Sequence, residues 1–275
     1  IEVGKSKSID LLAGYNPNTI KNVNPLACVD GLVIGDGSVH KASNDLIILY
    51  IGKNDKDYLN SYISPLIGRS REELAPGAYE VKSSIKPYEL PKTYYRCIPK
   101  RYLTSDHDTV CEFLKGLYSA NGSVVGKRVT LKTASSQLRD DVQIMLSSVG
   151  IRSYYTTNKP KEVQFSNGKY SCKESYDINI STDREIFLNK IGFLQEYKNS
   201  KLLNSLGSTS NKLKTHKIIA KELISTEEVF DITVDNKSHT YWSGGLNVSN
   251  CSELPLPPYD SCRLLAINLY SYVDK

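Results

Sequence analysis

Two stretches of the chain carry the same order of apolar and polar positions. The first is "ACVDGLVIGDGSV" at 27–39, followed by the apolar "LIILYI" and then by "DYLNSYISPLIGRS". The second is "CEFLKGLYSANGSV" at 111–124, followed by "RVTLKT" and "DDVQIMLSSVGIRS". Each stretch predicts a helix, a Gly-Ser-Val turn, a strand and a second helix that ends near Gly68 or Gly150. Agreement over several elements predicts a duplicated αββα-type unit.

The pattern changes after the second unit. The polar stretch "TTNKPKEVQFSNGKYSCKESYDINIS" predicts a β-hairpin with Asn167-Gly168 at its turn, and "REIFLNKIGFL" predicts a short helix. "KLLNSLGSTSNKL" has the composition of a linker, and "HKIIAKELISTEEVFDITVDNKSHTYWSGGLNVSN" predicts short strands joined by turns. From Cys251 onward "PLPPYD" cannot continue a sheet, because proline has no backbone N–H to donate.

Composition narrows the class of protein. With 275 residues, 40% of them hydrophobic and 24% charged, the chain predicts a soluble globular protein with room for more than one domain. It has no apolar run of about 18 residues that would predict a membrane span, and "IEVGKSKSID" lacks the apolar core of a secretory signal. Six cysteines without C-x-x-C spacing argue against a zinc ribbon or a secreted disulfide scaffold, and favour the reducing cytoplasm. The lack of an initiator Met predicts a fragment of something longer.

Charge adds a weaker indication. The net charge of the chain is +5, which fits a polyanionic partner such as DNA but is also found in many ordinary enzymes. The 19 tyrosines can serve DNA contacts on basic strands. As amphipathic residues they equally fit half-buried strand positions.

The two repeated helices carry candidate chemistry at their C-terminal ends. Small residues lie four positions apart on each, which lets two helices approach closely when they share a face: Gly31 and Gly35, then Gly116 and Ala120. Packing the helices side by side would bring Asp36 and Asn121 together. Two oxygen ligands near a pseudo-twofold axis suit Mg²⁺ shared between two scissile phosphates. Alternatively, the Asp-Gly and Asn-Gly pairs only end the helices.

Residues 25–200 resemble the LAGLIDADG family of homing endonucleases. "GLVIGDG" and "GLYSANG" are similar to its two motifs, and "YYRCIPKRYL" resembles the basic, Ile-Pro-containing segment between them. The resemblance implies two αββαββα-type halves whose sheets lie in the DNA major groove. It also implies that Asp36 is a catalytic, metal-binding acid.

The second motif departs from the family, because Asn121 replaces the usual acid. An amide oxygen can bind Mg²⁺ but brings no charge, so weaker metal binding is expected. Arg96 stands where the family often has Lys, and the resemblance makes Arg96 and Lys132 candidates for DNA contact or support of the site. Double-strand cleavage, nicking and plain DNA binding all remain open.

The Asn250-Cys251 pair is a second candidate site. The amide of an asparagine side chain can attack its own carbonyl and cleave the following peptide bond, which requires a polarising donor and a general acid. A cysteine directly after it supplies a thiol that can accept an acyl group. Without further context, the pair would carry no meaning.

The context resembles the C-terminal splicing blocks of inteins. In "VFDITVDNKSHTYWSGGLNVSN", Asp231 and His239 stand at the positions of the family's catalytic Asp and His. The resemblance makes Asn250 the cyclising residue and Cys251 the nucleophile that follows it. Ser249 stands where the family usually has His. In the absence of such a family context, Asp231 would be a turn or pairing carboxylate and His239 a strand-end histidine.

The last 25 residues resemble the active-site region of the ribonucleotide reductase large subunit, in its adenosylcobalamin-dependent class. The motif "CSELPLPPYDSC" implies a thiyl-radical cysteine at Cys251, a catalytic Glu253 and a dithiol cysteine at Cys262. Adenosylcobalamin would serve only the complete host reductase. The alternative is a Pro-rich docking tail.

Together these features predict an α+β protein with an all-β splicing region of the Hedgehog/intein (HINT) type. The predicted order is a remnant of a missing N-terminal splicing half at 1–24, the endonuclease domain at 25–200, a linker at 201–215, the C-terminal splicing region at 216–250 and the reductase segment at 251–275. The predicted partners are double-stranded DNA and the missing N-terminal splicing half, with Mg²⁺ for a monomeric endonuclease and no cofactor for splicing. The alternatives are a DNA-binding module with a degraded nuclease and a fragment of ribonucleotide reductase.

Overall fold

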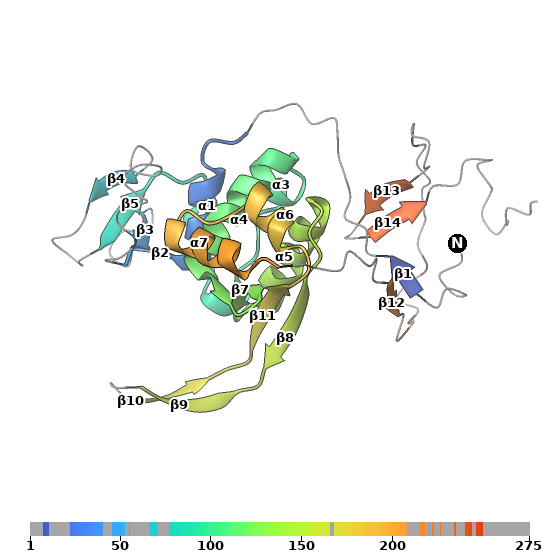
Figure 1. The fold of residues 1–275 in the computed structure, drawn as a ribbon. Helices are drawn as coiled ribbons and strands as arrows, with labels where there is room; N and C mark the ends of the chain where they lie inside the picture. Colours follow the sequence, from blue (N-terminus) through green and yellow to red (C-terminus); the bar gives the residue numbers. More distant parts are fainter. Residues whose placement is uncertain are drawn as a thin grey trace, which may run out of the picture.

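The computed structural model describes residues 8–10, 23–40, 46–52, 67–70, 77–165, 168–207, 215–217, 240–243 and 246–249, with a few single residues between them. The described part is a mixed α+β fold, as predicted (Figure 1). None of its helices is long and apolar enough to cross a membrane. Its four cysteines, Cys28, Cys97, Cys111 and Cys172, are all free thiols.

Two helices pack side by side at the centre of the fold. These are α1 (Ala27–Asp36) and α4 (His107–Asn121), the first helices of the two repeated units. The Asp106 carboxylate caps α4 by accepting a hydrogen bond from the Thr109 N–H at 2.9 Å. Each helix runs directly into a strand, β2 (Gly37–Val39) or β6 (Gly122–Val125). The predicted Gly-Ser-Val turns are therefore wrong: both glycines adopt extended backbone angles that begin a strand.

Each helix is followed by an antiparallel four-stranded sheet. The first sheet has the order β2-β3-β5-β4, and the second has the order β6-β7-β11-β8. Counted from its own helix, each sheet therefore places its strands in the order first, second, fourth, third. The remaining strands are β3 (Ile47–Tyr50), β4 (Ile67–Ser70), β5 (Ala78–Val81), β7 (Arg128–Thr133), β8 (Tyr154–Asn158) and β11 (Ser175–Ile180).

The second helix of the repeated unit is found in the second unit. It is α5 (Ser136–Ser148), which is capped by the Ser135 hydroxyl and followed by Gly150 in the left-handed region at φ 92°. In the first unit the corresponding residues lie outside the described part of the chain. Gly68, predicted to lie at the end of a helix, instead lies inside strand β4.

The elements after α5 match the prediction with two shifts. The predicted hairpin is β9 (Lys161–Phe165) with β10 (Gly168–Cys172), but Gly168 already pairs with Phe165, so the turn lies one residue earlier than expected. The predicted short helix is α6 (Arg184–Lys190). Helix α7 (Glu196–Ser205) runs into the region predicted as a linker from residue 201. The cause is Leu202, which is fully buried and holds this turn on the core.

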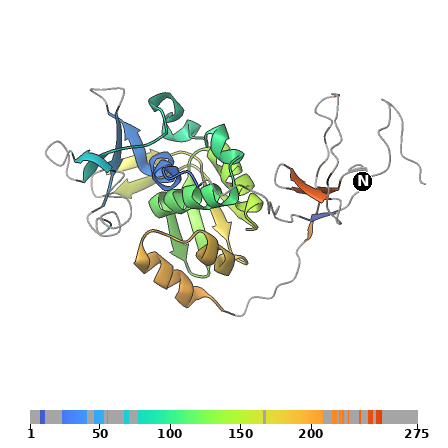
Figure 2. The same cartoon turned by 90° about the horizontal axis from the view of Figure 1, so that it is seen from above.

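Four short strands lie apart from the helices and the two large sheets (Figures 1 and 2). Strand β1 (Ser8–Asp10) pairs with β12 (Thr215–Lys217), and β13 (Thr240–Ser243) pairs with β14 (Leu246–Ser249), in both cases antiparallel. Strand β1 precedes the two repeated units and β12 follows them, so the chain segments on either side of these units meet in the β1–β12 sheet.

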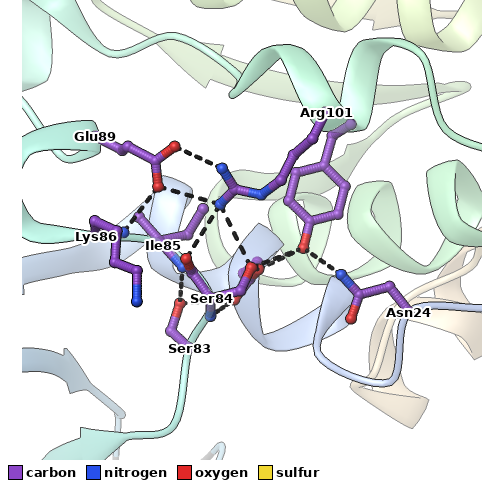
Figure 3. A network of polar contacts seen from close by, with 9 residues as sticks. Asn24, Ser83, Ser84, Ile85, Lys86, Glu89 and Arg101 are labelled. Atoms are coloured by element: carbon purple, nitrogen blue, oxygen red, sulfur yellow. Dashed lines mark hydrogen bonds and ion pairs between the residues drawn. The ribbon is translucent and has the colours of Figure 1, made fainter.

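The two units are joined by a segment that contains η4 (Pro87–Glu89), η5 (Thr93–Tyr95) and α3 (Lys100–Leu103). A buried polar network ties it to α1 (Figure 3). Asp30 is fully buried, and its Oδ1 accepts hydrogen bonds from the Ser83 hydroxyl at 2.6 Å and the Ser84 N–H at 2.9 Å. Its Oδ2 accepts from the hydroxyls of Ser84 and Tyr102. The buried carboxylate is thus satisfied by four donors.

We expect Tyr102→Phe to lower the free energy of unfolding by about 1–3 kcal/mol, because it leaves Asp30 short of a donor in a site that water does not reach. The ring itself stays packed, since Tyr102 is 1% exposed and contacts Phe113. Urea denaturation measures the change. Tyr88→Phe is the matched control, because Tyr88 is 84% exposed and should change stability very little. Equal effects of the two substitutions would contradict a stabilising role for the network.

Candidate functional site

Helices α1 and α4 are in backbone contact along their shared face. A Cβ atom added to Gly31 would lie 2.0 Å from the Phe113 carbonyl oxygen, and one added to Gly116 would lie 1.9 Å from the Cys28 carbonyl oxygen. Real Cβ atoms do not come this close, so only glycine fits either position. The prediction that the small residues of the two helices face one another is confirmed.

The same contact brings the two motif ends together. A Cβ atom on Gly35 would lie 2.5 Å from the Ala120 Cβ and 3.5 Å from the Asn121 Nδ2. The Asn121 amide therefore reaches the residue directly before Asp36. Asn121 is the last residue of α4, and Asp36 is the last residue of α1. Both therefore lie at the same end of the helix pair.

Arg96 holds the end of α1 rather than presenting its charge to solvent. Its guanidinium donates to backbone carbonyls from all three nitrogens: Nη1 to Ile34 at 2.6 Å, Val33 at 3.2 Å and Gly35 at 3.4 Å, Nη2 to Gly37 at 2.7 Å, and Nε to Pro91 at 2.9 Å. A helix C-terminus carries unpaired carbonyls and a partial negative charge, which a cation neutralises. Of the two roles predicted for Arg96, the geometry favours support of the site over DNA contact.

Lys198 on α7 does the same for α4, and sequence reasoning missed it. Its Nζ donates to the carbonyl oxygens of Ser119 at 3.0 Å and Gly122 at 2.9 Å. Each motif helix therefore ends against one cation from a distant part of the chain. In the sequence, Lys198 is one lysine that follows the predicted short helix, and no local pattern links it to α4.

These cations act on the Asp36 carboxyl. Protein atoms around it raise the pKa of Asp36 above its ordinary value, although the side chain keeps access to solvent, and the charges of Arg96 and Lys198 oppose that rise. Burial lowers the pKa of Lys198, and the charges of Asp55 and Asp36 oppose this change. Asp36 therefore lies in a partly dry site whose positive charge favours its ionised form.

Lys132 lies beside the Asn121 end of the site. It is exposed on β7 between the buried Leu131 and Thr133, so it faces away from the core. A cavity of about 170 Å³ is lined by Lys132, Asn121 and Arg96, with Thr93 and Ser175 at its edge. The structure thus brings the predicted residues Asn121, Arg96 and Lys132 around one cavity, and Asp36 is not among the residues that line it.

Asp36 and Asn121 offer Mg²⁺ only part of the ligand shell that it needs. Among the described residues, no group of three or more His, Cys, Asp or Glu side chains could hold a metal ion. Mg²⁺ is usually held by one or two carboxylates, with waters and substrate phosphates completing its shell. Asp36 and Asn121 supply one carboxylate and one amide oxygen, which fits Mg²⁺ only when a phosphate substrate supplies further ligands.

The residues predicted for splicing and for the reductase segment lie outside the described part of the chain: Asp231, His239, Asn250, Cys251, Glu253 and Cys262. The structure describes the hairpin between them. Thr240, the first residue of β13, pairs with Ser249, the last residue of β14.

We expect Arg96→Met to move the acid limb of any Asp36-dependent reaction to higher pH. The arginine charge holds the pKa of Asp36 down, so its loss lets burial raise that pKa further. At a fixed pH below neutrality, a smaller fraction of Asp36 is then ionised. A pH profile of Mg²⁺-dependent DNA cleavage measures the shift. Arg101→Met is the control, because Arg101 pairs with Glu89 instead, and an unmoved limb in Arg96→Met would contradict the coupling.

Comparison with known proteins gives three findings. Residues 108–192 match the family described as the LAGLIDADG-like domain. The chain is 25% identical over 258 residues to a DNA polymerase of Thermococcus hydrothermalis, with 83% of this chain and 15% of that protein covered. It is 26% identical over 194 residues to a DNA polymerase of Thermococcus sp. (strain GE8), with 64% and 11% covered. The chain therefore spans only a small part of the length of these relatives.

Similar solved structures include I-DmoI in complex with DNA and Ca, at a TM-score of 0.41 and 21% identity, covering 66% of this chain and 97% of that one. I-DmoI in complex with DNA and Mn has a TM-score of 0.38 at 21% identity, covering 61% and 96%. The family match begins in α4 and ends just after α6, so the segment that matches the LAGLIDADG-like domain is the second repeated unit, with Asn121 and Lys132 inside it.

Proposed function

We propose that residues 25–205 form a homing endonuclease domain that cleaves or nicks double-stranded DNA. The observation that carries the proposal is the pair of motif helices in backbone contact, which end together in Asp36 and Asn121. The identical strand order of the two sheets supports a duplicated unit of two αββαββα-type halves. The match of residues 108–192 to the LAGLIDADG-like domain supports the same reading.

The roles of the residues follow from their positions. Asp36 and Asn121 would hold Mg²⁺ beside a scissile phosphate, where the ion supplies Lewis-acid stabilisation of the developing charge and an activated water. Arg96 and Lys198 position the two helix ends, and their charges oppose the rise that burial causes in the pKa of Asp36. Lys132 lines the same cavity as Asn121, and its ammonium would pair with a phosphate oxygen there.

The two strands of DNA would meet unequal sites. Asp36 brings a negative charge at one helix end, whereas Asn121 brings none at the other. Because metal affinity at each position depends on ligand charge, the strand facing Asp36 should be cut faster. Accumulation of nicked DNA before linear DNA is therefore the expected product pattern.

The outward face of the second sheet fits the DNA. Arg128, Thr130 and Lys132 alternate with buried residues along β7, and Tyr154 on β8 is 41% exposed. A two-stranded β-ribbon can enter the major groove, where side chains read base edges. The β9–β10 hairpin extends beyond this sheet (Figure 1).

The proposal is tested on a supercoiled plasmid that carries the uninterrupted reductase gene segment, incubated with the protein and Mg²⁺. Nicked product followed by linear product is expected. Retained binding without any cleavage would instead support a DNA-binding module with a degraded nuclease. A plasmid without the segment controls for cleavage without site preference.

Splicing is a second candidate function with its own support. Strand β1, before the two repeated units, pairs with β12 after them, as expected when a domain is inserted into another fold. His239 and Asn250 are the next residues along the chain beyond the paired Thr240 and Ser249. In addition, most of this chain aligns with a small share of a much longer DNA polymerase, which fits an inserted element.

In the proposed reaction, the Asn250 side-chain nitrogen attacks the Asn250 carbonyl carbon. The bond to the Cys251 nitrogen breaks, the freed amine takes up a proton, and a succinimide remains on Asn250. His239 would polarise the carbonyl, and Asp231 would assist proton transfer. Before this step, the Cys251 thiol would take the upstream acyl group from the first residue of the N-terminal splicing half and release that residue's thiol or hydroxyl. After it, the freed Cys251 amine would take the acyl group from the Cys251 sulfur, which forms the new peptide bond. The chain from Cys251 would then belong to a reductase, with Glu253 and Cys262 among its catalytic residues.

We expect the chain to form a ligated product when it is expressed with an N-terminal splicing half, and Asn250→Ala to abolish release of its C-terminal segment. Intact mass spectrometry detects both species. Ser249→Ala is the matched control, because it changes the neighbouring residue without removing the amide nucleophile. If cleavage after residue 250 is equal in wild type and Asn250→Ala, the splicing proposal fails.

A further inference from the structure

The connecting segment, residues 82–101, concentrates the positive charge of the protein. It holds six cations and one acid, Glu89, so its net charge is +5. That equals the net charge of the entire 275-residue chain, and the rest of the protein is neutral on balance. The six cations are Lys82, Lys86, Lys92, Arg96, Lys100 and Arg101.

The two arginines of the connecting segment already have partners, but the lysines extend into solvent. Arg96 binds the carbonyls of α1, and Arg101 binds the Glu89 carboxylate through both ends of its guanidinium, at 2.5 and 3.2 Å. Lys82, Lys92 and Lys100 are exposed. None of these three forms an ion pair with an acid among the residues that the structure describes. Their charge is therefore available to an anionic partner.

Exposed aromatic rings lie between these lysines. Tyr88 is 84% exposed, Tyr95 is 73% exposed and Tyr94 is 43% exposed. Each exposed tyrosine offers a partner both an apolar ring and a polar hydroxyl. Clustered lysines are typical of surfaces that bind nucleic acid, and lysine and tyrosine side chains both donate to phosphate oxygens.

The connecting segment is held rigidly, although it contains little regular structure. At one end, Ser83 and Ser84 bind the buried Asp30 (Figure 3). Near the other end, the Ile98 N–H donates to the Asp141 carboxylate at 2.8 Å. The Ser135 hydroxyl donates to the Arg96 carbonyl at 2.5 Å. Because the backbone is already fixed, binding of a partner does not have to order this segment, and only side-chain freedom is lost.

The connecting segment also borders the candidate site. Thr93 and Arg96 line the same cavity as Asn121 and Lys132. Lys173, which leads from the β9–β10 hairpin into β11, places its Nζ 4.9 Å from the centre of the Tyr94 ring. A polyanion held at the cavity would therefore continue directly onto the connecting segment.

We propose that the connecting segment is a second DNA-contacting surface that binds the phosphate backbone of duplex DNA beside the cleavage site. The lysines neutralise phosphates, and the tyrosine hydroxyls donate to phosphate oxygens while the rings pack on the sugars. This surface carries no base-reading role, because its charges meet only the backbone. The inference rests on the proposed DNA-cleaving function.

The salt dependence of binding to a duplex of arbitrary sequence tests the proposal. Each phosphate that is neutralised contributes about 0.9 to the slope of log K against log salt concentration. We expect the variant Lys82→Ala/Lys92→Ala/Lys100→Ala to lose about 2–3 units of this slope, measured by fluorescence anisotropy. Tyr88→Ala/Tyr95→Ala should weaken binding without changing the slope. Lys201→Ala, an exposed lysine on α7, is the control for Lys92→Ala and should keep the wild-type slope.

The outcomes separate the two proposals. A folded triple variant with the wild-type slope would overturn the connecting segment as a DNA surface, while wild-type binding would leave the endonuclease proposal intact. A wild-type protein that binds no duplex at low salt would overturn the endonuclease proposal itself. Circular dichroism establishes the fold of each variant. If the triple variant does not fold, Lys92→Ala alone decides the matter, with an expected loss of about 0.9 in slope.

Discussion

Gly31→Ala should lower the free energy of unfolding of this protein by at least about 3 kcal/mol, although alanine is the better helix former. Alanine in place of glycine favours a helix by about 1 kcal/mol. Against this, the new methyl group would lie 2.0 Å from a backbone oxygen of α4, so the two helices would have to move apart. Overpacking costs about 1–3 kcal/mol when side chains can adjust, and backbone atoms adjust less.

Urea denaturation monitored by circular dichroism measures this effect. Gly116→Ala should behave in the same way, because its Cβ would meet the opposite helix at 1.9 Å. Gly207→Ala is the matched control, since a Cβ there meets nothing within 4 Å. An unchanged or higher denaturation midpoint for Gly31→Ala would show that the backbones of α1 and α4 are not in contact.

Asp36→Asn should reduce Mg²⁺-dependent DNA cleavage by at least about 100-fold, the upper end of what is lost when a residue only supports a metal ligand. The substitution keeps the shape of the side chain and removes the one charge that this helix end offers a cation. Stability should change little, because Asp36 is exposed. The loss should therefore appear in single-turnover cleavage and not in the denaturation curve.

The opposite change is expected at the other helix end. Asn121→Asp adds a second carboxylate beside Gly35, so Mg²⁺ affinity and the rate on the slower strand should both rise. Asp108→Asn, an exposed acid in the first turn of α4, is the control and should cleave like wild type. If Asp36→Asn cleaves at the wild-type rate, Asp36 is not a catalytic residue.

The helix pair was predictable from the sequence because its constraint is local and repeated. Glycines four apart define a contact face wherever the helix lies, and the repeat supplies the partner face. The Gly-Ser-Val segments were misjudged because glycine favours turns on average, whereas Gly37 and Gly122 pair across a sheet. The end of α7 was misjudged for a similar reason. Its polar composition resembles a linker, but the single buried Leu202 keeps it folded.

The candidate site could be predicted only in part. Asp36 and Asn121 follow from the duplication, and Lys132 lies near them. The role of Lys198 could not be predicted, because Ser119, whose carbonyl it binds, is far away in the sequence. Nothing in the sequence distinguishes this lysine from the others. Arg96 was recognised as important, but its partners were not. Without coordinates, a guanidinium that binds four backbone carbonyls at one helix end cannot be distinguished from one that binds phosphate.

The pairing of β1 with β12 has a consequence for how this gene can change. Because the strands before and after the two repeated units pair with each other, the chain between residues 10 and 215 leaves one small sheet and returns to it. Its deletion would leave two chain ends that a few residues can join. A shortened gene with a short linker between residues 10 and 215 would thus preserve that sheet.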